Sequence, residues 1–302
     1  ALESSWTELV KSHTKQRHQQ AALWEFVQTE LIYINKLKII KDVGPPGLIT
    51  MRVRVKPNQL FSNLPSILQA HQLFWQEVVF PMLQEVRRTG KPFDPMRLED
   101  GCLQFHERFL AYHHYCWEEE NNLEFTRKQM ESNPHFLAFV QWVEMHPQGE
   151  RMRLGDMQAK PHQRITKYPL LLKAVLKETQ EPHVQQALRA MLTTVNSFLE
   201  SINDFMQYKD EQLALYTSAQ KIEGYEVEGI NEEIDKVKWI RHQDFLQLIL
   251  AGPVTDVVAL LFSDVLLLTK VQKKAERLKV FRPPLALDRM NCVPLKDGSG
   301  PS

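Results

Sequence analysis

The stretch KPHQRITKYPLLLK, residues 160–173, decides the fold, because it combines helical spacing with a proline in its middle. The spacing predicts a helix over residues 160–178 with one apolar face buried in a core. Pro169 lacks an N–H, and its ring clashes with the carbonyl of Ile165, so we expect a kink there. The predicted apolar face consists of Ile165, Tyr168, Pro169, Leu172, Val175 and Leu176.

The opposite side of this helix mixes charged and apolar residues. Leu170 and Leu171 lie outside the apolar face, next to Lys167 and the small Ala174. Exposed leucines beside a cation are typical of a surface that binds a partner. A second interpretation, equally favoured by the pattern, is that another helix of the same domain covers them. This side comprises Lys160, Gln163, Lys167, Leu170, Leu171, Ala174 and Glu178.

Most of the chain before residue 222 has the three-four spacing of amphipathic helices. Asn63 is the expected N-cap of one helix, with Pro65 in its first turn. The segment KDVGPPGLIT, residues 41–50, is expected to be a loop. The predicted helices cover residues 19–40, 63–83, 100–120, 133–145 and 182–221.

The periodicity changes after residue 225. The runs VVALLF and VLLLTKV, separated by SD, predict two strands joined by a tight turn. RLKVF and PLALDRMNCVPL indicate further strands. Residues 245–268 are apolar enough to suggest a membrane span, but Gly252, Pro253, Asp256 and Asp264 interrupt them, and we therefore expect buried strands.

Composition favours a helical protein with a substantial core. Of 302 residues, 43% are hydrophobic and 11 are glycine. Lys plus Arg and Asp plus Glu both number 37, so the formal net charge is zero. This balance argues against a nucleic-acid partner. We expect a mainly α chain with a smaller β domain at its C-terminal end.

The cysteines indicate a reducing compartment. Cys102, Cys116 and Cys292 are odd in number and form no CxxC pair, so we interpret them as reduced thiols of a cytosolic protein. The opening residues ALESSWTELV lack the apolar region of a signal peptide.

No motif for covalent or metal chemistry is present. His106, His113, His114 and Cys116 are close in sequence, but Leu110 stands where a zincin needs its second histidine. There is no Walker loop, no GxGxxG and no hydrolase nucleophile signature. We therefore expect no metal, no cofactor and no bond-making activity.

Residues 160–179 resemble the third conserved region of Dbl-homology domains, the Rho guanine-nucleotide exchange factors. All fixed positions of Lys-Pro-x-Gln-Arg-x-x-[Lys/Arg]-Tyr-x-Leu-Leu-Leu-[Lys/Arg] are met. WEFVQTELIYINKL, residues 24–37, is similar to the first region, departing conservatively at Phe26 and Ile34, and LFSNLPSILQAHQLFWQEV to the second. The resemblance covers residues 17–222 and implies an elongated Dbl-homology helical bundle.

A pleckstrin-homology domain usually follows in this family, and residues 223–302 are similar to one. VVALLFSDVLLLTK resembles its third and fourth strands, and KKAERLKVFRPPL looks closest to the pleckstrin-and-RhoGEF family G subgroup, which includes the myosin-interacting GEF. The segment from Lys236 to Ser302 is shorter than a complete β-barrel of this type and lacks its C-terminal helix. The resemblance thus implies an incomplete pleckstrin-homology domain.

The resemblance also implies roles for particular residues. Glu25 corresponds to the carboxylate that engages switch I of the GTPase. Lys167 would dock on switch II with Gln163 beside it, and Leu170 and Leu171 would pack on the GTPase. Asn203 and Asp204 correspond to a polar pair that hydrogen-bonds switch II. Without the resemblance, Glu25, Lys167 and Asn203 would each be interpreted as an ordinary solvated helix position.

A basic run in the β domain has two interpretations. Lys270, Lys273, Lys274, Arg277 and Lys279 could contact an anionic membrane, or form a solvated loop. Residues 243–269 contain no Lys or Arg, which favours the loop.

The leading hypothesis is therefore a cytoplasmic exchange factor for a Rho-family GTPase, RhoA by subgroup, which displaces Mg²⁺ and GDP. The location would be peripheral at the membrane or the actin cytoskeleton. The alternative is an inactive Dbl-homology scaffold that binds GTPases or cytoskeletal partners without exchange. The complete set of Glu25, Lys167 and Asn203 argues against that alternative.

Overall fold

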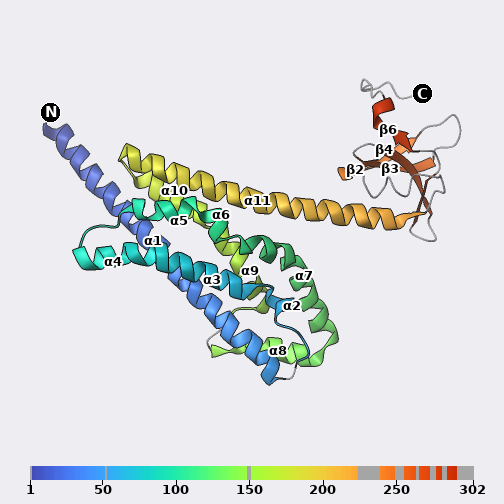
Figure 1. Ribbon diagram of the computed structural model, residues 1–302, viewed down its shortest axis with the longest axis horizontal. Coiled ribbons are helices and arrows are strands. Elements are labelled where there is room, and N and C mark those ends of the chain that lie inside the picture. The colour runs from blue at the N-terminus through green and yellow to red at the C-terminus, as the bar shows by residue number, and fades with distance from the viewer. Residues whose placement is uncertain are drawn as a thin grey trace. The chain divides into compact units, whose positions relative to one another are not determined.

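A computed structural model describes residues 2–51, 53–147, 151–223, 239–248, 255–262, 265–272, 277–280 and 284–290 of the chain (Figure 1). The chain divides into two compact units, residues 1–206 and 207–302. This division falls inside the last helix, whereas the domain ranges expected from the sequence, 17–222 and 223–302, place the boundary at the end of that helix.

The first unit is a helical bundle around one continuous core (Figure 1). Helix α1 packs against α10, α3 and α8, and α7 packs against α9, α8 and α2. The helices are α1 (Leu2–Thr50), α2 (Asn58–Phe61), α3 (Leu64–Phe74), α4 (Phe80–Thr89), α5 (Glu99–Leu103), α6 (Phe105–Arg108), α7 (Ala111–Ser132), α8 (Pro134–Met145), α9 (Leu154–Ile165), α10 (Tyr168–Glu178) and α11 (Pro182–Lys221). A 3₁₀ turn, η2 (Pro95–Leu98), precedes α5.

The segment 41–50 is helical, so the expected loop is wrong. It continues α1 through Pro45 and Pro46. Tertiary packing overrides the two prolines, because Leu48 is buried in the core and Gly47 lies against the aromatic rings of α8. A Cβ atom on Gly47 would approach Trp142 to 2.4 Å, so only glycine fits this contact.

The expected single helix over residues 63–83 is interrupted. A π-helical turn, η1 (Trp75–Val79), joins α3 to α4, and Pro81 stands in the first turn of α4. Proline cannot donate to a preceding carbonyl, and a π turn accommodates that loss. Asn63 precedes α3 as expected but makes no side-chain cap, since its amide donates to the carbonyl of Ala111 instead. Residues 100–120 likewise divide, among α5, α6 and α7.

The helix around Pro169 breaks rather than kinks. Helix α9 ends at Ile165 and α10 begins at Tyr168, so Pro169 occupies the first turn of a new helix. There its missing N–H costs nothing, because first-turn N–H groups have no partner inside the helix. The expected apolar face is confirmed: Ile165, Tyr168, Pro169, Leu172 and Val175 are buried and Leu176 is partly buried.

The last long helix is also confirmed. Helix α11 covers Pro182–Lys221, as the sequence predicts. Its expected stripe is buried from Val184 to Ile202, and Met206 is partly buried against the same core. The apolar spacing was sufficient here because no proline or glycine interrupts the helix.

The second unit contains a six-stranded sheet in the order β1-β5-β4-β3-β2, with β6 paired to β4. The strands are β1 (Ile222–Glu223), β2 (Trp239–Leu248), β3 (Thr255–Phe262), β4 (Val265–Gln272), β5 (Arg277–Val280) and β6 (Leu285–Ala286), followed by a 3₁₀ turn, η4 (Leu287–Arg289). The predicted hairpin is β3–β4, which pair antiparallel with Leu260 opposite Leu267. The residues RLKV of the predicted RLKVF form β5. Of the last predicted strand, residues 284–295, the described part contains β6 and the turn η4, and residues 291–295 lie outside the described residues.

The apolar stretch 245–268 forms parts of β2, β3 and β4 among the described residues, which confirms strands. No helix in the described part of the chain is long and apolar enough to cross a bilayer.

Cys102 and Cys116 are buried free thiols, as expected, and Cys292 lies outside the described residues. The basic run is not a loop at Lys270, Arg277 and Lys279, which lie in β4 and β5; Lys273 and Lys274 lie outside the described residues.

Candidate functional site

A shallow groove of about 200 Å³ on the helical unit brings together four of the residues expected to bind a partner: Glu25, Gln163, Lys167 and Leu171. The groove lies between α1 on one side and the α9–α10 stretch on the other. Its complete lining is Glu25, Thr29, Ile32, Tyr33, Lys36, Lys160, Gln163, Arg164, Lys167 and Leu171. Residues separated by more than 120 positions thus share one surface.

The two walls have the same helical spacing. On α1 the wall consists of Glu25, Thr29, Ile32 and Lys36, at steps of four, three and four residues. On the other wall Lys160, Gln163, Lys167 and Leu171 follow at steps of three, four and four. On α1 such steps keep the side chains on one face of the helix, whereas the other wall continues across the break between α9 and α10, where Lys167 lies. Two rows of mostly polar side chains, each with one apolar member, therefore line the same groove.

A buried ion pair lies directly behind the groove and joins its walls. Arg164 of α9 donates from Nε and Nη2 to the carboxylate of Glu30 on α1, with an Nε–Oε2 distance of 3.2 Å. Its Nη1 donates to Thr29, which lines the groove. Both Glu30 and Arg164 are buried. The pair fixes where α9 lies against α1, and with it the distance between the walls.

Two further helices donate to the same carboxylate. Tyr168 of α10 donates to Oε2 of Glu30 at 2.7 Å, and His71 of α3 contacts Oε1 at 2.7 Å. Since an ionised carboxylate only accepts, His71 donates from Nδ1, and its Nε2 accepts from Tyr112 at 2.8 Å. Tyr112 in turn contacts Tyr33, which lines the groove.

The pKa values of this network follow from burial and charge. Burial alone would raise the pKa of Glu30, but the electrostatic interactions with His71 and Arg164 and the hydrogen bonds from His71 and Tyr168 lower it to about 2. Burial lowers the pKa of His71, an effect that outweighs Glu30, so the imidazole is neutral at pH 7 and Arg164 is the balancing cation. Burial also disfavours the charged form of Arg164, yet Glu30 raises its pKa above the usual value.

The first turn of α10 is held by aromatic contacts as well. The ring of Tyr168 lies 5.1 Å from that of Phe105, 5.7 Å from Phe26 and 5.8 Å from Phe109, mostly edge to face. Such pairs contribute about 0.5–1.5 kcal/mol each beyond their burial. This packing places the neighbouring Lys167 and Leu170 at the surface.

The structure separates the two leucines that the sequence placed together. Leu170 is 64% exposed, as expected, whereas Leu171 is only 8% exposed and packs in the core beneath the groove. The expectation of an exposed Leu171 is therefore wrong, although its side chain still forms part of the groove lining. The reason is the new helix start at Tyr168, which turns Leu171 towards α1.

Asn203 and Asp204 are exposed on α11, as expected for partner-binding residues, but they do not line the groove. Leu170 is also outside the lining. Glu25, Gln163 and Lys167 are exposed within it.

Sequence reasoning missed half of the groove. Thr29, Ile32 and Lys36 continue the face of Glu25 along α1, so their spacing from Glu25 could have identified them. Ile32 gives a second signal, because it is a large apolar residue that remains 44% exposed. Tyr33 and Arg164 could not be found this way, since they are buried and reach the groove floor from the core side.

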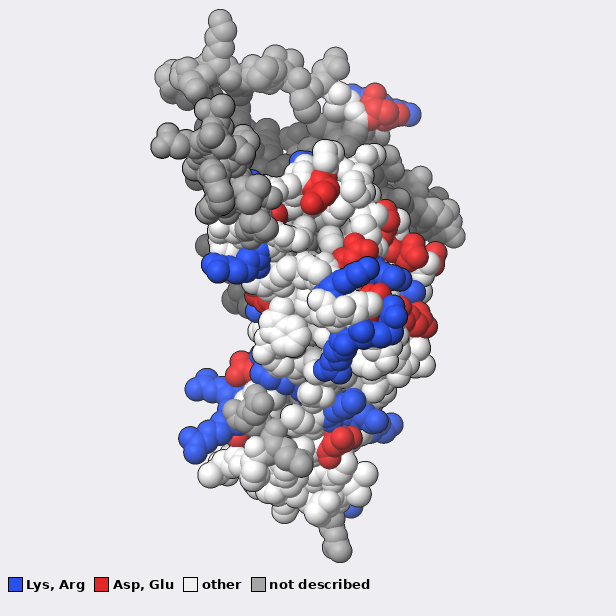
Figure 2. Space-filling view, turned by 90° about the vertical axis from the view of Figure 1, so that its left-hand side faces the viewer, with Lys and Arg blue, Asp and Glu red and all other residues white. Residues whose placement is uncertain are grey.

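Figure 2 shows one face of the molecule, on which basic and acidic side chains of the described residues alternate. This distribution agrees with the formal net charge of zero.

Comparison with known proteins identifies the helical unit. Residues 22–203 match the model of the RhoGEF domain family. The chain is 44% identical, over 98% of its length, to pleckstrin homology domain-containing family G member 6 of Mus musculus. It is 39% identical, over 98% of its length, to family G member 5 of Rattus norvegicus. It spans 42% and 32% of these two relatives, so it corresponds to less than half of either.

Solved structures share the fold of the chain. The DH/PH domains of PDZ-RhoGEF, in complex with GTP-gamma-S activated RhoA, match with a TM-score of 0.75 and 20% identity, over 91% of this chain and 81% of that one. The N-terminally truncated linker-DH/PH domains of p115-RhoGEF match with a TM-score of 0.70 and 22% identity, over 90% of this chain and 84% of that one. The expected mainly α fold with a smaller β unit is confirmed. The chain belongs to the RhoGEF, or Dbl-homology, family of guanine-nucleotide exchange factors.

Proposed function

We propose that this chain is a guanine-nucleotide exchange factor for a Rho-family GTPase, with RhoA preferred. The groove carries the proposal, because Glu25 and Lys167, which correspond to the family's switch-binding positions, lie 142 residues apart in sequence and line one surface. A related fold, that of PDZ-RhoGEF, has been solved with RhoA bound. The identity of this chain to family G members supports the same class of partner.

The proposed mechanism requires no covalent chemistry. A protein that binds the nucleotide-free GTPase more tightly than the loaded form must weaken nucleotide binding by the same factor. Phosphate and Mg²⁺ hold the switch loops of a GTPase in order, so a surface that takes over those loops releases both. The groove supplies such a surface without itself rearranging, since a buried ion pair fixes its walls.

Different residues of the groove and of α11 would contact different parts of the GTPase. Glu25 on the α1 wall engages switch I and draws it away from the nucleotide. Lys167 and Gln163 on the opposite wall bind switch II, and Leu170 beside them packs on an apolar part of the GTPase. Leu171 supports this contact from below, because it is buried in the groove floor. Asn203 and Asp204 on α11 provide a second polar contact to switch II.

The test is the release of a fluorescent GDP analogue from RhoA, a Rac-type and a Cdc42-type GTPase. We expect the chain to accelerate release most strongly from RhoA. Glu25→Ala, Lys167→Ala and Asn203→Ala should each slow that release by about tenfold or more, the effect of losing a binding hot spot. Circular dichroism should show that each variant is folded.

Lys177→Ala is the matched control, because Lys177 is also an exposed lysine of α10 but lies outside the groove lining. Its exchange rate should equal that of the unchanged chain. Binding of a GTPase without faster release would instead support the scaffold hypothesis. Equal loss of activity in Lys177→Ala and Lys167→Ala would contradict the role of the groove.

We also propose that the protein is cytoplasmic and is located peripherally at an anionic membrane or at the actin cytoskeleton, through weak contacts of the β unit. Lys270 of β4 and Lys279 of β5 are cross-strand partners, and Arg277 follows on the same hairpin. A basic residue near anionic lipid contributes about 1 kcal/mol. Cosedimentation with phosphatidylserine vesicles and with actin filaments, at low and high salt, would separate the two partners.

A further inference from the structure

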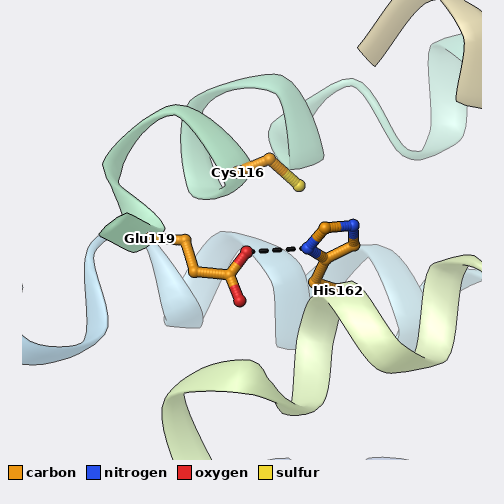
Figure 3. A group of neighbouring side chains, drawn as sticks. All are labelled: Cys116, Glu119 and His162. Atoms are coloured by element: carbon orange, nitrogen blue, oxygen red, sulfur yellow. Dashed lines mark hydrogen bonds and ion pairs between the residues drawn. The ribbon is translucent and has the colours of Figure 1, made fainter. Parts of the chain in front are cut away.

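Three potential metal ligands meet on the helical unit, outside the groove. Cys116 and Glu119 lie three residues apart on one face of α7, and His162 reaches them from α9 (Figure 3). The thiol sulfur, a carboxylate oxygen and an imidazole nitrogen all lie within 4.8 Å of one another. Oxygen Oε2 of Glu119 is 2.8 Å from Nδ1 of His162.

The chemistry of this set fits zinc. Thiolate, imidazole and carboxylate are the three side-chain ligands that Zn²⁺ uses, and three protein ligands with one water make a common tetrahedral site. Bonds of about 2.0–2.3 Å place tetrahedral ligand atoms roughly 3.3–3.8 Å apart. The Glu119–His162 pair must therefore open slightly and the sulfur must approach, which side-chain rotation can achieve.

Burial gives the site a closed side and an open side. Cys116 is 1% exposed, whereas the His162 side chain is 47% exposed and that of Glu119 is 16% exposed. A metal ion can enter past His162 and reach the thiol at the back. Its fourth ligand, a water molecule, would face the same opening. Figure 3 shows the thiol of Cys116 directed towards the imidazole.

We propose that Cys116, Glu119 and His162 form a site for Zn²⁺ that links α7 to α9. Binding replaces the proton of the Cys116 thiol by the metal, so one proton goes to solvent, and His162 contributes a nitrogen lone pair. The link matters for the groove, because α9 also carries Lys160, Gln163 and Arg164. A bound metal would hold this wall of the groove against α7.

The test uses Co²⁺ as a spectroscopic substitute for Zn²⁺, added to the complete, reduced chain without an affinity tag. We expect one equivalent to produce a thiolate-to-cobalt charge-transfer band, which Zn²⁺ then abolishes. Cys116→Ser should remove the band. His162→Gln should weaken Zn²⁺ binding by at least about tenfold, measured by competition with a fluorescent zinc indicator. This variant changes a half-exposed residue, so it tests the site even if Cys116→Ser fails to fold.

His18→Gln is the matched control. His18 also pairs with a glutamate, Glu178, at 3.8 Å, but that pair is not part of a three-ligand group among the described residues. Its metal affinity should equal that of the unchanged chain. Absence of the band, its persistence in Cys116→Ser, or an unchanged Zn²⁺ affinity in His162→Gln would overturn the proposal. In those cases the Glu119–His162 contact is an ordinary surface ion pair and Cys116 an ordinary core thiol.

Discussion

Two glutamates five residues apart on α1 have opposite surroundings. Glu25 is exposed in the groove, whereas Glu30 is completely buried. The opposite wall repeats the contrast, since Lys167 is exposed and Arg164, three residues earlier, is buried. The same two charge types thus line the groove on one side and form a buried ion pair directly behind it.

The contrast teaches that the position of a charge on its helix decides its energetic role. An exposed charge is already solvated, so its removal changes stability by little. Removing one member of a buried pair leaves the other charge unsolvated and uncompensated. We call the exposed Glu25, Lys167 and Leu170 the outer layer, and the buried Glu30 with its partners Arg164, Tyr168 and His71 the inner layer. Substitutions in the outer layer should therefore alter exchange, and those in the inner layer should alter folding.

The largest effect is expected from Arg164→Leu. It leaves the Glu30 carboxylate buried without its cation, so the free energy of unfolding should fall by about 3–5 kcal/mol. Urea denaturation followed by tryptophan fluorescence measures this. Lys167→Ala, the outer-layer control, should change the same quantity by less than about 0.5 kcal/mol. Similar decreases in the free energy of unfolding in both variants would contradict the proposed difference between exposed and buried charges.

Acid should destabilise the inner layer next most strongly. The pKa of Glu30 is lowered from 4.5 to about 2, so the unfolded chain binds this proton more readily than the folded one. Ionised Glu30 therefore contributes about 3 kcal/mol to the free energy of unfolding. This contribution is complete above pH 4.5 and is lost as the pH falls towards 2. The lowered pKa of His71 acts in the same direction and starts the decline below about pH 6.5.

Glu30→Gln provides the control for this pH dependence. The amide cannot titrate, so the variant should be less stable at pH 7 and lose less stability on acidification. Denaturation curves at several pH values between 7 and 3 measure both. An identical decline in the variant and the unchanged chain would assign the acid sensitivity to other groups.

A smaller loss is expected from Tyr168→Phe. The substitution keeps the aromatic ring and its packing but removes the hydroxyl that donates to Glu30 at 2.7 Å. A hydrogen bond to a buried charged group contributes about 2 kcal/mol, and the free energy of unfolding should fall by that amount. An unchanged unfolding curve would mean that Arg164 and His71 alone satisfy the carboxylate.

The smallest effect is expected from Leu170→Ala in the outer layer. Leu170 is 64% exposed, so stability should stay within about 0.5 kcal/mol of the unchanged chain. Affinity for nucleotide-free RhoA should fall by about 1 kcal/mol, or roughly fivefold. Surface plasmon resonance measures this affinity. A loss of stability without a loss of affinity would mean that Leu170 supports folding and does not bind the GTPase.

Sequence reasoning recovered the elements that local spacing governs. Helix α11, the apolar face around Tyr168 and the β3–β4 hairpin all follow from apolar periodicity. It failed where tertiary contacts override a local signal. The continuation of α1 through Pro45 depends on packing by Leu48 and Gly47 against residues far along the chain.

The exposed residues of the groove were partly predictable, because motifs and helical spacing are local signals. Glu25, Gln163 and Lys167 carry the family motif and are exposed in one groove. The pairing of Arg164 with Glu30 was not predicted, because the two residues are 134 positions apart: the three-four spacing from Phe26 and Ile34 places Glu30 on the buried face of α1 but does not say which basic residue meets it. Leu171 was misplaced since the position of a helix start decides which way a side chain faces.

By itself the sequence determined that this chain is a helical Dbl-homology bundle followed by strands, and which motif residues belong to it. Periodicity and motifs are local properties of the sequence, so they can be recognised without a structure. Only the tertiary structure decided which charges are solvated, where the two walls of the groove meet, and that His162 lies beside Cys116 and Glu119. These outcomes depend on how distant helices pack, and burial and electrostatic strength are consequences of that packing.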